Sequence, residues 1–155
     1  MELSEPNLER IEQAQQQKPD SLCNNMKCCP INNTLNLIGK KFTILLIRNM
    51  MMLKQTRFNQ FMDSIEDINP KTLSIRLKEM EKDGLIKRKV FHEIPVRVEY
   101  LLTEKAMGLT PILEQMAIFS MRYCTKDVFR GPPPKNVENL YSNIITKYRT
   151  AAQSS

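Results

Sequence analysis

A capped amphipathic helix followed at once by strand-like sequence constrains the fold of this chain more than any other feature. Asn69 can accept a hydrogen bond at a helix N-terminus, and Pro70 fits the first turn, where its missing N–H does no harm. Apolar residues from Leu73 to Met80 then recur at the spacing of one helical face. We therefore expect a helix over residues 70–83 with one buried side.

Beyond Gly84 the apolar pattern changes from the helical period to that of strands, which predicts a β-hairpin. The remaining apolar patterns are mostly helical. The expected elements are a first helix ending at Gly39, a second over 42–50, a short third over 57–65, the helix over 70–83, strands over 85–92 and 96–102, and a further helix from Thr103 past Pro111 to Tyr123. They predict a mainly α fold with a small β-hairpin wing, the winged helix-turn-helix arrangement.

Length and composition allow one hydrophobic core with appendages. The chain has 155 residues, 41% of them hydrophobic, so two full domains would be cramped. We expect a polar N-terminal arm over residues 1–27 and a winged-helix domain over 28–124. The remainder, 125–155, is expected to be a C-terminal extension with a short helix in its apolar stripe at 137–148.

The positive charge of the chain lies in its middle. The formal net charge is +6, and residues 40–97 alone carry thirteen basic and seven acidic side chains. A basic stretch of this kind favours a polyanionic partner, although the bias alone also fits many proteins that bind no nucleic acid.

The outward side of the 70–83 helix carries residues that could read a nucleic acid. At about 100° per residue, Lys71, Ile75 and Lys78 lie opposite the buried side, with Thr72 and Ser74 flanking them. Ammonium and hydroxyl groups can bind phosphates or base edges, and an aliphatic side chain can contact a thymine methyl group. On an isolated helix such lysines more often serve only solubility. The adjoining hairpin favours DNA, so we assign these five residues to the major groove of double-stranded DNA.

Further basic residues are assigned to the wing and to the DNA backbone. Arg97 lies near the hairpin tip, where a guanidinium group fits a phosphate or a narrow minor groove. Arg57, Arg76 and Lys82 are expected to support phosphate contacts. The basic run 87–89 alternates along a strand, so only part of it would face DNA. The competing interpretation is a winged-helix module that binds another protein and binds DNA only nonspecifically.

The sequence offers no catalytic constellation and no cofactor motif. It has one histidine, no glycine-rich phosphate loop and no nucleophile with a matching base, so an enzyme is not expected. Combining Cys23, Cys28 and Cys29 with Cys124 or His92 would not give the paired C-x2-C spacing of structural zinc, so no metal is expected. Without a membrane-length apolar run or a signal peptide, we expect a cytoplasmic protein with reduced thiols.

Several long motifs of the chain resemble the HxlR-type winged helix-turn-helix transcriptional regulators, which are related to the MarR-like regulators. The matching segments are Cys29-Pro30, 37–48, 57–58, 69–88 and 95–105, within a resemblance that covers about 28–123. The chain departs from the family pattern at three places. Phe42 stands where the family usually has Trp, and Lys40 where a second Gly is common. Ala106-Met107 stands where a Gly usually follows the Thr-Glu-Lys run. The resemblance implies a homodimer that binds an inverted-repeat operator and is held together largely by its terminal helices.

The same resemblance singles out the cysteines before the first helix. Some members of the family sense oxidants or electrophiles through a cysteine at the position of Cys29, and Cys28 is a second candidate. A helix N-terminus and the nearby Lys27 could favour a reactive thiolate. The alternative is an inert thiol, since free cysteines are commonly small buried hydrophobes. Control by a small-molecule effector also stays open.

Overall fold

The computed structural model describes residues 26–136. The predicted N-terminal arm lies almost entirely outside the described residues, and so does the predicted helix at 137–148. The boundary between two compact units of the chain falls between Asn33 and Thr34. The elements discussed below belong to the second unit, except for the start of the first helix.

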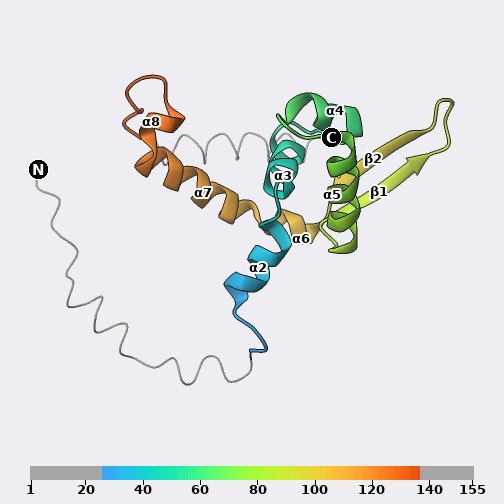
Figure 1. The fold of residues 1–155 in the computed structure, drawn as a ribbon, viewed down its shortest axis with the longest axis horizontal. Helices are drawn as coiled ribbons and strands as arrows, with labels where there is room; N and C mark the ends of the chain where they lie inside the picture. The colour runs from blue at the N-terminus through green and yellow to red at the C-terminus, as the bar shows by residue number, and fades with distance from the viewer. Residues whose placement is uncertain (1–25, 137–155) are drawn as a thin grey trace, which may run out of the picture. The chain divides into compact units, whose positions relative to one another are not determined.

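The described residues form a mainly helical structure with one antiparallel hairpin, which confirms the predicted fold class (Figure 1). The elements are α2 (Pro30–Ile38), α3 (Thr43–Met52), α4 (Phe58–Ser64), α5 (Pro70–Lys82), β1 (Ile86–Phe91), β2 (Arg97–Leu102), α6 (Glu104–Met107), α7 (Thr110–Tyr123) and α8 (Thr125–Val128). Helix α5 lies beside the hairpin, as the helix that reads DNA does in a winged helix-turn-helix.

Local sequence signals account for both ends of α5. The Asn69 side chain accepts a hydrogen bond of 2.8 Å from the backbone N–H of Thr72, as its position as helix cap predicted. At the other end the N–H of Leu85 reaches the carbonyl of Met80 at 2.8 Å, and Gly84 adopts φ 71°. This left-handed turn suits glycine and directs the chain from the helix into β1.

The core lies where α5 packs against the helices before it and the segments after it. Leu73, Leu77 and Met80 present the buried side of α5, as its sequence pattern predicted. They belong to one cluster with Leu46 and Ile47 of α3, Phe61 of α4, and Leu85 and Ile86 at the start of the hairpin. The burial of one α5 face fixes which side of the helix remains exposed.

Polar contacts brace α3 against α4. The fully buried Asn49 donates from Nδ2 to the Ser64 hydroxyl at 2.8 Å, and that hydroxyl donates to Gln55 at 2.8 Å. The Gln60 side chain accepts from the backbone N–H groups of Thr56 and Arg57, both at 2.9 Å, and so satisfies donors at the start of α4.

The hairpin is attached to the helical core through β2. The strands pair from Ile86 opposite Leu102 to Phe91 opposite Arg97. The N–H of Tyr100 also donates to the carbonyl of Thr56 at 2.8 Å, just before α4. The wing is therefore positioned from two sides, by the short turn after α5 and by the segment that precedes α4.

The expectation of one continuous helix from Thr103 to Tyr123 is wrong. The structure has two helices, α6 and α7, separated by Gly108 and Leu109. Pro111 has no N–H to offer the carbonyl of Met107, its helical partner four residues earlier. The Thr110 hydroxyl donates to that carbonyl instead, at 2.6 Å, so the chain turns and a new helix starts with Pro111 in its first turn.

Candidate nucleic-acid interface

The predicted DNA-reading residues share the solvent-facing side of α5. Lys71, Ser74, Ile75 and Lys78 are exposed, and Thr72 is half-buried. We call these five residues the reading face. Ile75 is 47% exposed although it is aliphatic. A single exposed aliphatic side chain is common on protein surfaces. Between lysines on this face, it is also placed where it could contact a thymine methyl group.

The lysines of α5 are available to an external anion. Among residues 26–136, no ion pair occupies Lys71, Lys78 or Lys82, and Lys82 is exposed at the end of the helix. The structure thus brings three ammonium groups to the outer side of one helix, and none of them is paired with a carboxylate of the described residues.

Arg76 lies in a different environment from these lysines. Its side chain is 14% exposed and is bonded to Glu79, which also binds the Nζ of Lys40 at 3.1 Å. The Arg76 Nε is buried and has no hydrogen-bond partner among the described residues. Glu79 therefore links α5 to the segment before α3. A phosphate could bind the Arg76 guanidinium group only in competition with Glu79.

Carboxylates also hold Arg97, at the start of β2. Its Nε and Nη2 donate to the two carboxylate oxygens of Glu93 at 3.0 and 2.8 Å, and Nη1 donates to Glu99. The guanidinium group lies over the Phe91 ring, with Cζ 3.8 Å from the centroid. The Arg57 Nη2 atom lies 3.9 Å from Glu99 Oε1. Two guanidinium groups and two carboxylates therefore meet at the wing.

The Arg97–Glu93 hydrogen bonds favour the charged forms of both groups. They raise the pKa of Arg97 above its ordinary value and lower the pKa of Glu93. Both groups are therefore charged at neutral pH, and their charges compensate each other. A DNA phosphate could accept hydrogen bonds from the Arg97 guanidinium group only by displacing a carboxylate.

The basic run on β1 is divided between the two faces of the hairpin. Arg88 lines a cleft together with Ser74 and Lys78 of α5. Lys87 and Lys89 alternate with Arg88 along the strand and lie on the other hairpin face. Arg88 was missing from the predicted site residues, although the apolar Ile86, two positions earlier, marks the inward face of this strand.

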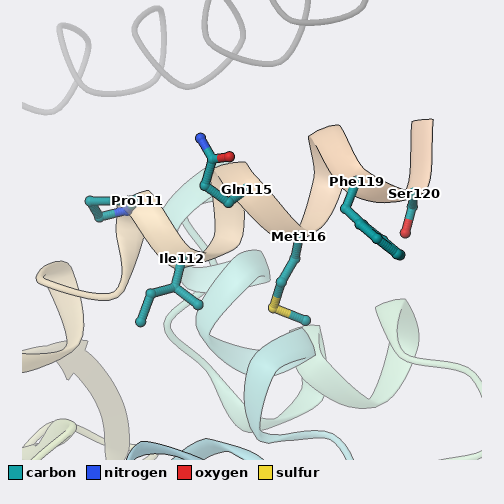
Figure 2. A pocket seen from close by; sticks show the side chains of 6 residues that line it. All are labelled: Pro111, Ile112, Gln115, Met116, Phe119 and Ser120. Atoms are coloured by element: carbon teal, nitrogen blue, oxygen red, sulfur yellow. The ribbon is translucent and has the colours of Figure 1, made fainter. Parts of the chain in front are cut away.

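Helix α7 exposes an apolar side that the described residues do not cover. Ile112, Met116 and Phe119 point to the same side of the helix in Figure 2. They line a shallow pocket together with Pro111, Gln115 and Ser120. Met116 is 49% and Phe119 60% exposed. An apolar surface of this kind on a helix usually marks a contact with another element or chain.

The cysteines show no metal-binding arrangement in the part of the chain that the structure describes. Cys28 and Cys29 are exposed before α2, and Cys124 is half-buried after α7. Within residues 26–136, no three His, Cys, Asp or Glu side chains are grouped closely enough to hold a metal ion. Nor does any helix in that range have the length and apolarity needed to span a membrane.

Comparison with known proteins identifies the family of the chain. The model of the HxlR-like helix-turn-helix family matches residues 37–128, more than half of the sequence. An uncharacterized HTH-type transcriptional regulator of Halalkalibacterium halodurans is 41% identical over 98 residues, which cover 63% of this chain and 87% of the relative. The family match includes the whole of α5 and the hairpin.

Solved structures agree with the sequence matches. The oxidized form of the redox regulator HypR has a TM-score of 0.55 and 37% identity, covering 61% of this chain and 96% of that one. The reduced form of the transcriptional regulator YodB from Bacillus subtilis has a TM-score of 0.54 and 32% identity, covering 63% and 95%. The resemblance seen in the sequence and the prediction of a non-enzymatic protein are both confirmed: the chain belongs to the HxlR-like helix-turn-helix family of transcriptional regulators.

Proposed function

We propose that this regulator acts as a cytoplasmic homodimer that binds an inverted-repeat operator in double-stranded DNA and recognises its sequence. The observation that carries the proposal is the reading face of α5, exposed next to a hairpin and bearing lysines without ion-pair partners among the described residues. A homodimer would present two such helices, related by the same symmetry as the two halves of an inverted repeat.

The proposed contacts divide between bases and backbone. Lys71, Thr72, Ser74, Ile75 and Lys78 would lie against base edges in the major groove. Lys82 and Arg57, both exposed, would contact phosphates. Arg76 and Arg97 remain predicted phosphate contacts, and each would exchange a carboxylate for a phosphate oxygen when DNA binds.

Titration of the protein with genomic DNA fragments at several salt concentrations separates this function from the alternative of a protein-interaction module. A regulator with several phosphate contacts would prefer particular fragments, and its affinity would fall steeply with salt. A module that binds another protein would bind all fragments weakly and alike.

The apolar side of α7 supports the proposed dimer, and a charge placed there is expected to separate the protomers. A second copy of the chain could cover Ile112, Met116 and Phe119 with the same face, as a two-fold interface requires. Met116→Glu would bury an unpaired carboxylate, so sedimentation should find mostly monomer at concentrations at which the unmodified protein is a dimer.

Asn59→Glu is the matched control for this dimer test. It adds the same charge at an exposed position of α4 that does not line the pocket on α7. The control variant should remain dimeric. A dimeric Met116→Glu variant, or an unmodified protein that is monomeric while bound to its operator, would contradict this interface.

The exposed cysteine pair favours a second property, control by oxidation. Cys28 and Cys29 are accessible, and one structural relative is a redox regulator, HypR, whose oxidized form is known. We expect a mild oxidant to change operator affinity several-fold in the unmodified protein and to have little effect on Cys29→Ser, because a thiolate sulfur is the reacting atom. Equal responses in a gel-shift titration would refute this role, and a small-molecule effector would remain a separate prediction.

A further inference from the structure

The two faces of the β-hairpin carry different charged residues and have different neighbours. Residues directly opposite in the antiparallel register share a face, so Arg88 and Tyr100 lie on the same side as Ile86 and Leu102. Ile86 is buried in the core, and Tyr100 and Leu102 pack against it. This inner face of the hairpin is therefore turned toward the helices.

The outer face carries the other members of the strands, and the arginine on it is paired with carboxylates. Lys89 lies opposite Glu99 in the register, with its Nζ 4.9 Å from the centroid of the Phe91 ring. Arg97 lies opposite Phe91 and is bonded to Glu93 and Glu99. The basic run on β1 is thus divided by the strand pleat, with Arg88 alone on the inner face.

A cleft between α5 and the hairpin contains the Arg88 side chain. The buried Leu77 and the half-buried Tyr100 form part of its wall, and the exposed Ser74, Lys78, Glu81 and Arg88 provide its polar groups. Ser74 and Lys78 belong to the reading face of α5. Arg88 therefore lies next to two residues of the reading face.

The charge of this cleft matches a single phosphodiester. Two cations and one carboxylate line it, so its net charge is one positive unit. Within the described residues, no ion pair occupies Arg88 or Lys78, unlike Arg57, Arg76 and Arg97. A guanidinium group can donate two parallel hydrogen bonds to phosphate oxygens, which an ammonium group cannot.

We infer that Arg88 binds a DNA backbone phosphate at the edge of the groove that α5 enters, with the cleft between α5 and the hairpin as the phosphate site. This inference rests on the proposed function and adds a contact that the sequence did not assign. It also distinguishes Arg88 from the neighbouring Lys87 and Lys89, which have the same charge but the opposite orientation.

The test compares Arg88→Ala with Lys89→Ala in the full-length protein. Both variants lose one positive charge from the same strand. Arg88→Ala should weaken binding to a selected operator fragment by about 5- to 30-fold at ~0.1 M salt and reduce the slope of log affinity against log salt by about 1. Lys89→Ala should change affinity less than about twofold and leave that slope unchanged. Arg88→Lys should retain the slope, because it keeps the charge, and lose part of the affinity, because it cannot bind bidentately.

The outcomes separate the inference from the proposed function. If Arg88→Ala keeps the salt slope of the unmodified protein, or if Lys89→Ala matches its loss, the inference is overturned while operator selection by the unmodified protein still stands. If the unmodified protein shows no sequence preference, the proposed function itself fails. Should Arg88→Ala melt at a lower temperature, the folded Arg88→Lys decides: a retained slope with reduced affinity supports the phosphate contact, and unchanged affinity overturns it.

Discussion

Replacing Lys71 and Lys78 together by alanine is expected to weaken operator binding by roughly 30- to 1000-fold, at about 1–2 kcal/mol for each lost contact. Both ammonium groups lie on the exposed side of α5, and neither has an ion-pair partner among the described residues. Their removal should not disturb the core, because the buried side of α5 is made by other residues. Fluorescence anisotropy with labelled operator DNA would measure the loss.

The control for this variant removes the same amount of charge elsewhere. Lys126→Ala combined with Lys135→Ala deletes two exposed lysines that lie after α7, away from the reading face in sequence. A general electrostatic effect would weaken binding in both double variants by similar factors, and this result would count against specific contacts by α5. A large loss confined to the α5 variant supports the proposed reading face.

Leu73→Ala is expected to have the largest effect on folding, a loss of about 2–5 kcal/mol in the free energy of unfolding. Leu73 is completely buried in the cluster formed by α3, α4 and α5, and truncation would leave a cavity between these helices. Urea denaturation at a fixed protomer concentration would measure the loss, because the stability of a dimer depends on its concentration.

Ile75→Ala, on the same helix, is expected to leave the free energy of unfolding nearly unchanged. Ile75 is two residues from Leu73 but 47% exposed, so its truncation should change stability by less than about 1 kcal/mol. Its expected effect is on operator affinity, through a lost contact with a thymine methyl group. If Ile75→Ala destabilised the protein as much as Leu73→Ala, the orientation of α5 described above would be wrong.

The sequence predicted α5 and the hairpin well because their signals are local. The side-chain cap at Asn69, the proline beside it and the glycine after the helix each act on the backbone within a few residues. The apolar spacing from Leu73 to Met80 then gave the buried side correctly. The exposed side follows from the buried one, so the placement of the reading-face lysines was predictable as well.

The break between α6 and α7 shows where local reasoning was insufficient. Pro111 was recognised as a perturbation, but its effect depends on what replaces the missing N–H. The Thr110 hydroxyl binds the free carbonyl of Met107, and the first turn of α7 accommodates the proline. A new helix start and a kinked continuous helix give nearly the same apolar pattern, so sequence spacing alone does not separate them.

The arginines were the least predictable part of the site. Arg76 and Arg97 were assigned from their charge, whereas the structure pairs each of them with carboxylates. Arg97 binds Glu93 across the hairpin loop and Glu99 along its own strand, and neither pairing leaves a periodic signal. The face on which Arg88 lies depends on the strand register, which becomes certain only when the buried Ile86 is located.

The central claim, that a dimer of this chain reads an inverted repeat through α5, is tested most directly by selecting genomic DNA fragments bound by the unmodified protein. We predict that the bound fragments share two half-sites in inverted orientation, with their centres about one helical turn apart or a multiple of it. The Lys71→Ala, Lys78→Ala double variant should fail to enrich the same fragments. Recovery of fragments with no common sequence, or equal enrichment by the double variant, would contradict the claim.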